Sequence, residues 1–251
     1  MVLRNELKRR LQRDEQVYGT WVTIESPMAT EMLSTLGFDY FVFDTEHSPL
    51  DIYKSQTLMQ AMRGDQTTPI IRVWWNDLVQ IKRALDVGAY GVVVPWVNTK
   101  EEAESAVKAS RYAPDGLRGC GPRRASMFDP DYLKTADEEI LVICQIETKR
   151  AVENIEDIVS VEGVDVSYIG PADLSASYDH LGNHSHPDVQ KAIDKVFDAT
   201  KAAGKAAGVH LGSGKTIRDR MEKGYNFITI GNDLIYLKNG VLNHLKELGL
   251  K

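Results

Sequence analysis

Two carboxylates, Glu147 and Asp173, are the residues whose types and spacing point most directly to metal chemistry. Each follows closely on an apolar run, the first ending at Ile146 and the second at Gly170. In a parallel sheet the carboxyl ends of neighbouring strands lie about 4.8 Å apart, so the two side chains can converge on one cation. Oxygen donors suit Mg²⁺ or Mn²⁺ better than Zn²⁺, and Co²⁺ stays open. The alternative is that Glu147 caps a helix and Asp173 braces a loop.

A histidine and an arginine on the preceding runs add acid–base and electrostatic chemistry. His47 follows Asp44 and Glu46 at the end of the second run, where it can exchange a proton if a nearby acid raises its basicity. A plain rim histidine is the alternative, and spacing does not choose its acid. Arg72 interrupts an apolar run, so its charge needs either a barrel acid or an anionic substrate.

Other candidate motifs favour structural interpretations. His180, His184 and His186 follow Asp173, but their spacing fits no helical ligand pair, so we interpret them as polar loop residues rather than a metal cage. The pair Trp74-Trp75 is interpreted as packing rather than a pocket wall.

The segment 212–215, Gly-Ser-Gly-Lys, is interpreted as a turn rather than a phosphate cradle, because the complete Walker pattern is missing. No lysine lies in the predicted strands, which argues against a Schiff-base aldolase.

Eight strand-like runs alternate with helical patterns, which predicts a closed TIM (β/α)₈ barrel with its active site at the carboxyl ends of the strands. The predicted strands are Gly19–Ile24, Tyr40–Thr45, Pro69–Trp74, Gly91–Val97, Ile140–Ile146, Val164–Gly170, Ala207–Leu211 and Phe227–Gly231. The predicted helices are Thr30–Leu36, Ile52–Arg63, Asp77–Val87, Lys100–Ser110, Arg150–Ser160, Asp188–Ala203, Thr216–Lys223 and Leu234–Leu248. Residues 1–15 predict an additional amphipathic helix, and the Gly- and Pro-rich segment 110–140 predicts an excursion over the catalytic mouth or an oligomer contact.

Composition limits the class of protein. The 251 residues carry a net charge of -6, which argues against a nucleic-acid partner, and no segment reaches the roughly 18 apolar residues of a membrane span. Cys120 and Cys144 are far apart and unpatterned, as in a reduced compartment. We therefore expect one cytoplasmic domain over residues 1–251, with the basic residues 8–10 on a solvated helix face.

Five motifs in order give the chain its family likeness. They are Gly37-Phe38-Asp39-Tyr40 with Asp44-Thr45-Glu46-His47, Leu85-Asp86-Val87-Gly88-Ala89, Arg111-Tyr112-Ala113-Pro114-Asp115-Gly116-Leu117-Arg118-Gly119, Gln145-Ile146-Glu147-Thr148 and Gly170-Pro171-Ala172-Asp173-Leu174-Ser175. Over about residues 19–237 the chain resembles the HpcH/HpaI family of metal-dependent pyruvate aldolases.

The resemblance implies a role for each matched position. Glu147 and Asp173 would bind a divalent metal (Mg²⁺, Mn²⁺ or Co²⁺) that holds pyruvate, and Gln145 with the Ala172–Asp173 segment would contact that pyruvate. His47 would be the general base, Asp86 the acid that raises its basicity, and Arg72 the cation that stabilises the enolate. The implied reaction splits a 4-hydroxy-2-oxo acid into pyruvate and an aldehyde through a metal-bound pyruvate enolate.

Other functions remain open on the same scaffold. They are oxaloacetate decarboxylation, lyase action on a CoA thioester, and a non-catalytic barrel that binds pyruvate and metal. The resemblance also implies a homo-oligomer, a trimer or hexamer, with helix 234–248 as a candidate contact. Two departures from the family, at Trp74-Trp75 and at Tyr178-Asp179-His180, bear on the aldehyde pocket rather than on the metal.

Overall fold

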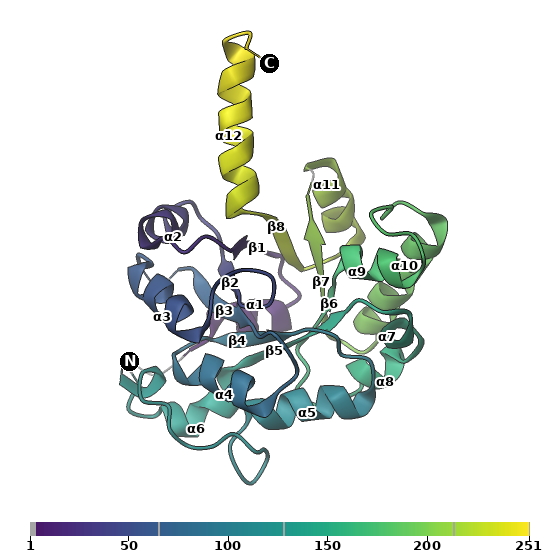
Figure 1. Ribbon diagram of the computed structural model, residues 1–251. Coiled ribbons are helices and arrows are strands. Elements are labelled where there is room, and N and C mark those ends of the chain that lie inside the picture. Colours follow the sequence, from purple (N-terminus) through teal and green to yellow (C-terminus); the bar gives the residue numbers. More distant parts are fainter. Residues whose placement is uncertain (1–3, 65, 128, 213, 251) are drawn as a thin grey trace.

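The structure is a computed structural model that describes residues 4–64, 66–127, 129–212 and 214–250. Its eight strands run parallel and close into a barrel in chain order (Figure 1), which confirms the predicted TIM barrel. The strands are β1 (Val17–Val22), β2 (Tyr40–Asp44), β3 (Thr68–Arg72), β4 (Gly91–Val94), β5 (Leu141–Ile146), β6 (Val166–Ile169), β7 (Ala206–Leu211) and β8 (Phe227–Asn232). Ser213, in the predicted Gly-Ser-Gly turn, and Met1 to Leu3 lie outside the described residues.

Helices surround this barrel and begin, in most cases, with a side-chain cap. They are α1 (Glu6–Gln12), α2 (Pro27–Ser34), α3 (Ile52–Ala61), α4 (Leu78–Asp86), α5 (Lys100–Ser110), α6 (Tyr132–Glu139), α7 (Lys149–Glu153), α8 (Ile155–Val159), α9 (Pro171–Ser177), α10 (Pro187–Ala202), α11 (Gly214–Lys223) and α12 (Asp233–Glu247), with a 3₁₀ turn at Ala125–Met127. Asp51, Asp77 and Thr99 each accept a hydrogen bond from the first turn of their helix, so polar residues after a strand start the next helix.

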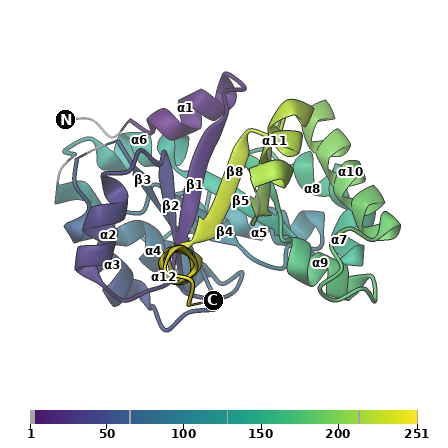
Figure 2. The same cartoon turned by 90° about the horizontal axis from the view of Figure 1, so that it is seen from above.

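The core has two parts that follow from the alternation of side chains along each strand. Side chains such as Val42, Ile70 and Phe227 fill the barrel interior, whereas a larger apolar cluster lies between the strands and the outer helices. Leu7 and Leu11 of α1 belong to the interior cluster. Helix α1 thus covers the amino-terminal end of the barrel, beside the start of β1 (Figure 2).

The basic residues 8–10 of α1 are paired, not solvated, so the expectation from the sequence is wrong. Lys8 is buried; its Nζ donates to the Ile140 carbonyl at 2.8 Å and lies 3.1 Å from Asp165. Arg9 pairs with Glu139 and Arg10 with Asp39. The cause is tertiary: α1 lies across the barrel end, where these acids are.

The long segment between α5 and β5 does not cover the catalytic mouth. Because α5 runs back along the barrel, the segment begins at the amino-terminal end, where Arg118 donates to Asp86 at 2.8 Å and Arg124 donates to the Val87 carbonyl. It also contains helix α6, which the sequence did not predict.

Several other element boundaries differ from prediction. The expected helix 150–160 is two helices, α7 and α8, broken at Asn154, whose amide donates to the Asn98 carbonyl at 2.8 Å. Helix α9 starts directly after β6, where only a loop was expected. Strands β3 and β4 end earlier than predicted, at Arg72 and Val94.

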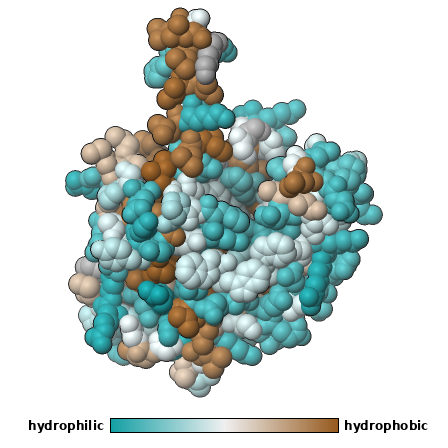
Figure 3. Space-filling view, in the orientation of Figure 1, coloured by the Kyte–Doolittle hydropathy of each residue, from teal (hydrophilic) through white to brown (hydrophobic). Residues whose placement is uncertain are grey.

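The last helix, α12, projects away from the barrel (Figure 1). Its main contacts are with β8 and β1, and apolar residues cover much of its visible surface (Figure 3). Leu234, Leu237, Val241 and Leu248 are all more than half exposed. Within the described residues, no helix combines the length and apolarity that a membrane crossing requires.

Candidate active site

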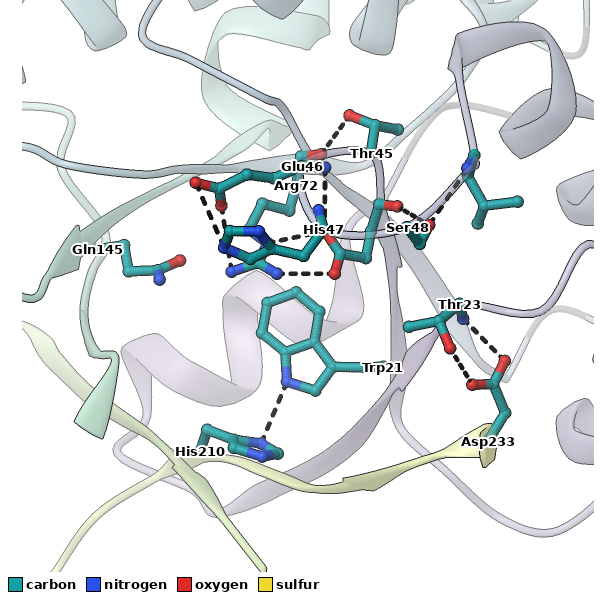
Figure 4. Close-up of polar contacts among 12 residues, drawn as sticks. Trp21, Thr23, Thr45, Glu46, His47, Ser48, Arg72, Gln145, His210 and Asp233 are labelled. Carbon is teal, nitrogen blue, oxygen red and sulfur yellow. Dashed lines mark hydrogen bonds and ion pairs between the residues drawn. The ribbon is translucent and has the colours of Figure 1, made fainter. Parts of the chain in front are cut away.

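Arg72 lies at the centre of a charged cluster at the carboxyl end of the barrel. The β2–β3 register places Asp44 beside Arg72, and the guanidinium donates through Nε and Nη2 to the two Asp44 oxygens at 3.0 and 2.7 Å. The Nη1 atom of Arg72 lies 3.2 Å from Glu46 Oε2, and its guanidinium carbon, Cζ, lies 4.2 Å from the Trp21 ring centroid (Figure 4). Burial lowers the pKa of Arg72, but the bond to Asp44 and the charge of Glu46 outweigh it, so the side chain stays charged.

A neutral histidine, His210, holds the Trp21 ring in place under Arg72. Trp21 Nε1 donates to Nδ1 of His210 at 3.1 Å (Figure 4). Burial, together with the nearby charge of Arg72, lowers the pKa of His210 to about 4. His210 is therefore an uncharged acceptor near neutral pH, and it orients the Trp21 ring under Arg72.

Glu147 is almost fully buried at the end of β5, with a relative exposure of 1%. Its Oε1 accepts the backbone N–H of Trp96 at 2.9 Å, and its Oε2 accepts from the Gln145 amide. Burial raises the pKa of Glu147 to about 7; the two hydrogen bonds oppose the rise, and the charges of Glu46 and Asp173 add to it.

Asp173 approaches Glu147 from helix α9 rather than from a strand end. Ile146 pairs with Ile169, so the residue level with Glu147 is Gly170, and Asp173 follows in the first turn of α9. Its charge nonetheless reaches Glu147 and helps to raise the pKa of that residue. Ala172 is exposed beside it.

Gly170 leaves room for this contact. A Cβ at this position would lie 2.7 Å from Glu147 Oε2 and 3.0 Å from Gln145 Nε2, closer than packing allows. The glycine therefore permits the two functional side chains to approach the backbone between β6 and α9.

His47 lies next to the same cluster with an open ring. Its side chain is 61% exposed, and Nε2 lies 3.7 Å from Glu46 Oε1 (Figure 4). Its backbone N–H donates to Asp44 at 3.2 Å. The structure therefore brings His47, Arg72, Gln145 and Glu147 to one end of the barrel, where an imidazole can meet a ligand from solvent.

Asp86 is not with them. It is the last residue of α4, at the amino-terminal end of the barrel, and its Oδ1 accepts from Arg118 Nη2 at 2.8 Å. The strands separate this position from His47, so a single chain does not bring the two side chains together.

The described carboxylates of the mouth outnumber its cations. Arg72 is the cation that the structure places among Asp44, Glu46, Glu147 and Asp173. Burial raises the pKa of Glu46 to about 7; Arg72 opposes the rise, whereas Asp44 and Asp173 add to it. This excess of negative charge, held by hard oxygen donors, fits a divalent cation.

A buried amide oxygen points to a ligand at the same place. Among the described residues, Gln145 Oε1 is buried without a hydrogen-bond partner, whereas its Nε2 is committed to Glu147. A buried polar atom of this kind costs free energy unless water or a ligand satisfies it.

Two parts of this site escaped the sequence analysis. Glu46 was considered only as a possible partner of His47, although it lies just beyond β2, two residues after Asp44, which is the spacing of side chains that face the same side. The backbone of Trp96 gives no sequence signal: its φ of 56° directs the N–H to Glu147.

Comparison with known proteins agrees with this geometry. The profile of HpcH/HpaI aldolase/citrate lyase matches residues 17–239. The chain belongs to this family. A 5-keto-4-deoxy-D-glucarate aldolase from Shigella boydii serotype 18 is 41% identical over 236 residues, which cover 93% of this chain and 92% of that protein. The predicted class, an aldolase and thus a carbon–carbon lyase, is confirmed.

Solved structures include one similar family protein and more distant proteins that share only the fold. A family protein from Burkholderia cenocepacia J2315 superposes with a TM-score of 0.92 at 37% identity, covering 97% of this chain and 99% of that one. The citrate lyase β subunit from M. tuberculosis, complexed with oxaloacetate and magnesium, shares the fold with a TM-score of 0.61 at 14% identity, covering 89% of this chain and 94% of that one.

Proposed function

We propose that this family member splits a 4-hydroxy-2-oxo acid into pyruvate and an aldehyde with the help of a divalent metal. The observation that carries the proposal is the excess of carboxylates at the mouth, where, among the described residues, Asp44, Glu46, Glu147 and Asp173 share the charge of Arg72. Glu147 and Asp173 would hold Mg²⁺, Mn²⁺ or Co²⁺, which when bound acts as a Lewis acid toward a keto oxygen.

The chain's own residues supply the remaining groups. Gln145 offers the unpartnered Oε1 and, with Ala172 and Asp173, lines the place for the pyruvate unit. Arg72, held by Asp44, presents a fixed positive charge where negative charge develops on the pyruvate oxygen as the C3–C4 bond breaks.

His47 is the proposed general base that removes the proton of the C4 hydroxyl. Its ring is exposed, and the carboxylate of Glu46 at 3.7 Å can stabilise the protonated imidazole. If Asp86 acts on His47, as the family resemblance implies, that carboxylate comes from a second copy of the chain, because the two residues lie at opposite ends of one barrel.

The aldehyde side of the site has an aromatic wall. Trp75 and Trp96 stack with ring centroids 6.5 Å apart and remain 55% and 41% exposed. Because the backbone N–H of Trp96 donates to Glu147, we propose that its partner Trp75 has the pocket-wall role that the sequence interpretation ranked below packing. We propose 5-keto-4-deoxy-D-glucarate, named for the Shigella boydii relative, as the first substrate to test.

Chelation tests the proposal. Purified protein stripped with EDTA should lose pyruvate formation from 4-hydroxy-2-oxo acids, and Mg²⁺, Mn²⁺ or Co²⁺ should restore it. Oxaloacetate and CoA thioesters in the same panel separate the aldolase from the decarboxylase and thioester-lyase alternatives. Full activity in EDTA, or binding of pyruvate without turnover of any substrate, would contradict the proposal.

We further propose a cytoplasmic homo-oligomer, a trimer or hexamer. The exposed apolar residues of α12 support association, since a helix attached mainly through its first turns leaves apolar surface in water. The free cysteines Cys120 and Cys144 agree with a reducing compartment. Light scattering of the wild type and of a Leu237→Glu, Val241→Glu variant tests the assembly: a monomeric wild type refutes it.

A further inference from the structure

The strongest feature outside the mouth lies between α9 and the start of α10. His180 and His186 stack with ring centroids 3.4 Å apart, and both face the carboxylate of Asp188. His180 Nε2 and His186 Nδ1 each lie 3.7 Å from Asp188 Oδ2, and one ligand atom from each of the three residues falls within 4.8 Å of the others.

We propose that His180, His186 and Asp188 form a second metal site, separate from Glu147 and Asp173, that takes a borderline cation such as Zn²⁺. The sequence interpretation favoured polar loop residues because no helical ligand spacing is present. The fold brings the three together through a loop instead.

The distances fit a shared cation better than hydrogen bonding. A nitrogen and an oxygen 3.7 Å apart are too far for a hydrogen bond. Ligands held about 2.0–2.2 Å from a tetrahedral Zn²⁺ lie roughly 3.3–3.6 Å from one another. The two nitrogen–oxygen separations exceed this range by only a few tenths of an ångström, roughly. The stacked imidazoles would also rotate apart on binding, so that both nitrogens point at the ion.

The donor set differs in kind from the one at the mouth. Two imidazole nitrogens and one carboxylate oxygen suit Zn²⁺, whereas carboxylates alone suit Mg²⁺ or Mn²⁺. The site competes with one local contact, because His186 Nδ1 also accepts the backbone N–H of Asp188 at 3.3 Å and so caps α10. A bound cation would replace this long hydrogen bond. The positive amino terminus of α10 would repel the cation, and the negative charge of Asp188 would offset that repulsion.

The location gives the site a structural consequence. Residues 178–186 connect α9, which carries Asp173, to α10. A cation held by His180 on the loop and Asp188 on the helix would tie this connection at two points. We expect it to stabilise the folded chain in proportion to its occupancy.

Zinc calorimetry in the presence of excess Mg²⁺ tests the site, because Mg²⁺ occupies hard oxygen sites and leaves imidazole donors free. The wild type should bind one Zn²⁺ per chain and gain thermal stability from it. His180→Ala and His186→Ala should each weaken Zn²⁺ binding at least about tenfold and lose the thermal gain, whereas Glu147→Gln should keep both.

Matched controls come from the other histidines. His184→Ala lies in the same loop, and His244→Ala lies on α12; both should bind Zn²⁺ like the wild type. Circular dichroism checks that each variant is folded. Equal Zn²⁺ affinity in the His180→Ala, His184→Ala and wild-type proteins, or no Zn²⁺ bound in excess Mg²⁺, would overturn the site. The readout is binding, so it stands whether or not the proposed aldolase reaction fails.

Discussion

The charged side chains are paired differently at the two ends of the barrel. At the amino-terminal end, acids and bases pair one to one: Lys8 with Asp165, Arg9 with Glu139, and Arg118 with Asp86. At the carboxyl end, Arg72 pairs with both Asp44 and Glu46. Glu147 is buried there with hydrogen bonds but with no ion-pair partner among the described residues. Burying an unpaired carboxylate costs free energy, so one end is arranged for stability and the other for a ligand.

The largest expected effect is the loss of activity in Glu147→Gln, at the carboxyl end of the barrel. Glu147→Gln should lower pyruvate formation on the order of 100-fold or more, because the neutral amide is a poor metal ligand. The same change should leave the metal-free protein as stable or more stable, since a buried carboxyl whose pKa is raised to about 7 no longer has to ionise. Activity assays and urea unfolding at pH 8 in EDTA measure the two effects.

Glu139→Gln is the matched change at the amino-terminal end. It removes the ion pair with Arg9 and weakens the acceptor for the Asn5 N–H, so it should cost about 1–2 kcal/mol of unfolding free energy with little loss of activity. If Glu147→Gln lowers the stability in EDTA and Glu139→Gln does not, the proposed division between a stabilising amino-terminal end and a ligand-binding carboxyl end is wrong.

Acid stability sharpens the comparison through His210. Its pKa falls from 6.5 in the unfolded chain to about 4 in the folded one, because burial and Arg72 disfavour the charged form. Between these values the unfolded chain binds a proton that the folded chain does not, so the contribution of His210 to stability should fall by about 3 kcal/mol as the pH drops from 6.5 to 4. Glu46 and Glu147, whose pKa values are raised to about 7, change the stability in the opposite direction, so the effect of His210 is read as a difference between variants.

Unfolding at several pH values in this range should therefore show the wild type losing stability relative to His210→Asn as the pH falls. Asn retains an acceptor for Trp21 but cannot take up a proton. His244→Asn, at an exposed position of α12, should keep the wild-type profile. If the stability difference between the wild type and His210→Asn stays constant across this range, burial and the charge of Arg72 do not lower the pKa of His210.

A smaller effect is expected from Gly170→Ala. The added Cβ would meet Glu147 Oε2 at 2.7 Å and displace it, so we expect a roughly tenfold weaker metal affinity. Gly121→Ala is the control, because a Cβ there meets nothing within 4 Å and its φ is not in the left-handed region. If Gly170→Ala binds Mn²⁺ as tightly as the wild type, the metal does not lie beside the backbone of Gly170.

The sequence predicted the barrel well because the strands are short apolar runs and most helices begin at a recognisable cap. It placed Glu147 and Arg72 at the correct end, since strand order alone fixes which residues follow β5 and end β3. The sequence placed Asp173 at the end of a strand because it closely follows an apolar run. In the structure, helix α9 begins directly at Pro171, without the expected loop, and carries Asp173 in its first turn.

Other features depend on contacts that no local pattern contains. The burial of Lys8 requires α1 to lie across the barrel, and the convergence of His180 with Asp188 requires the loop to fold back on α10. The direction of the segment after α5 was misjudged because it follows a helix rather than a strand, which places it at the amino-terminal end.

Manganese calorimetry tests the central claim most directly. A His180→Ala background removes the proposed second site, so one class of site remains to be measured. The account predicts one Mn²⁺ per chain in this background, weakened at least about 100-fold by Glu147→Gln or Asp173→Asn and unchanged by Glu139→Gln. Equal Mn²⁺ affinity with and without the Glu147 carboxylate would contradict it.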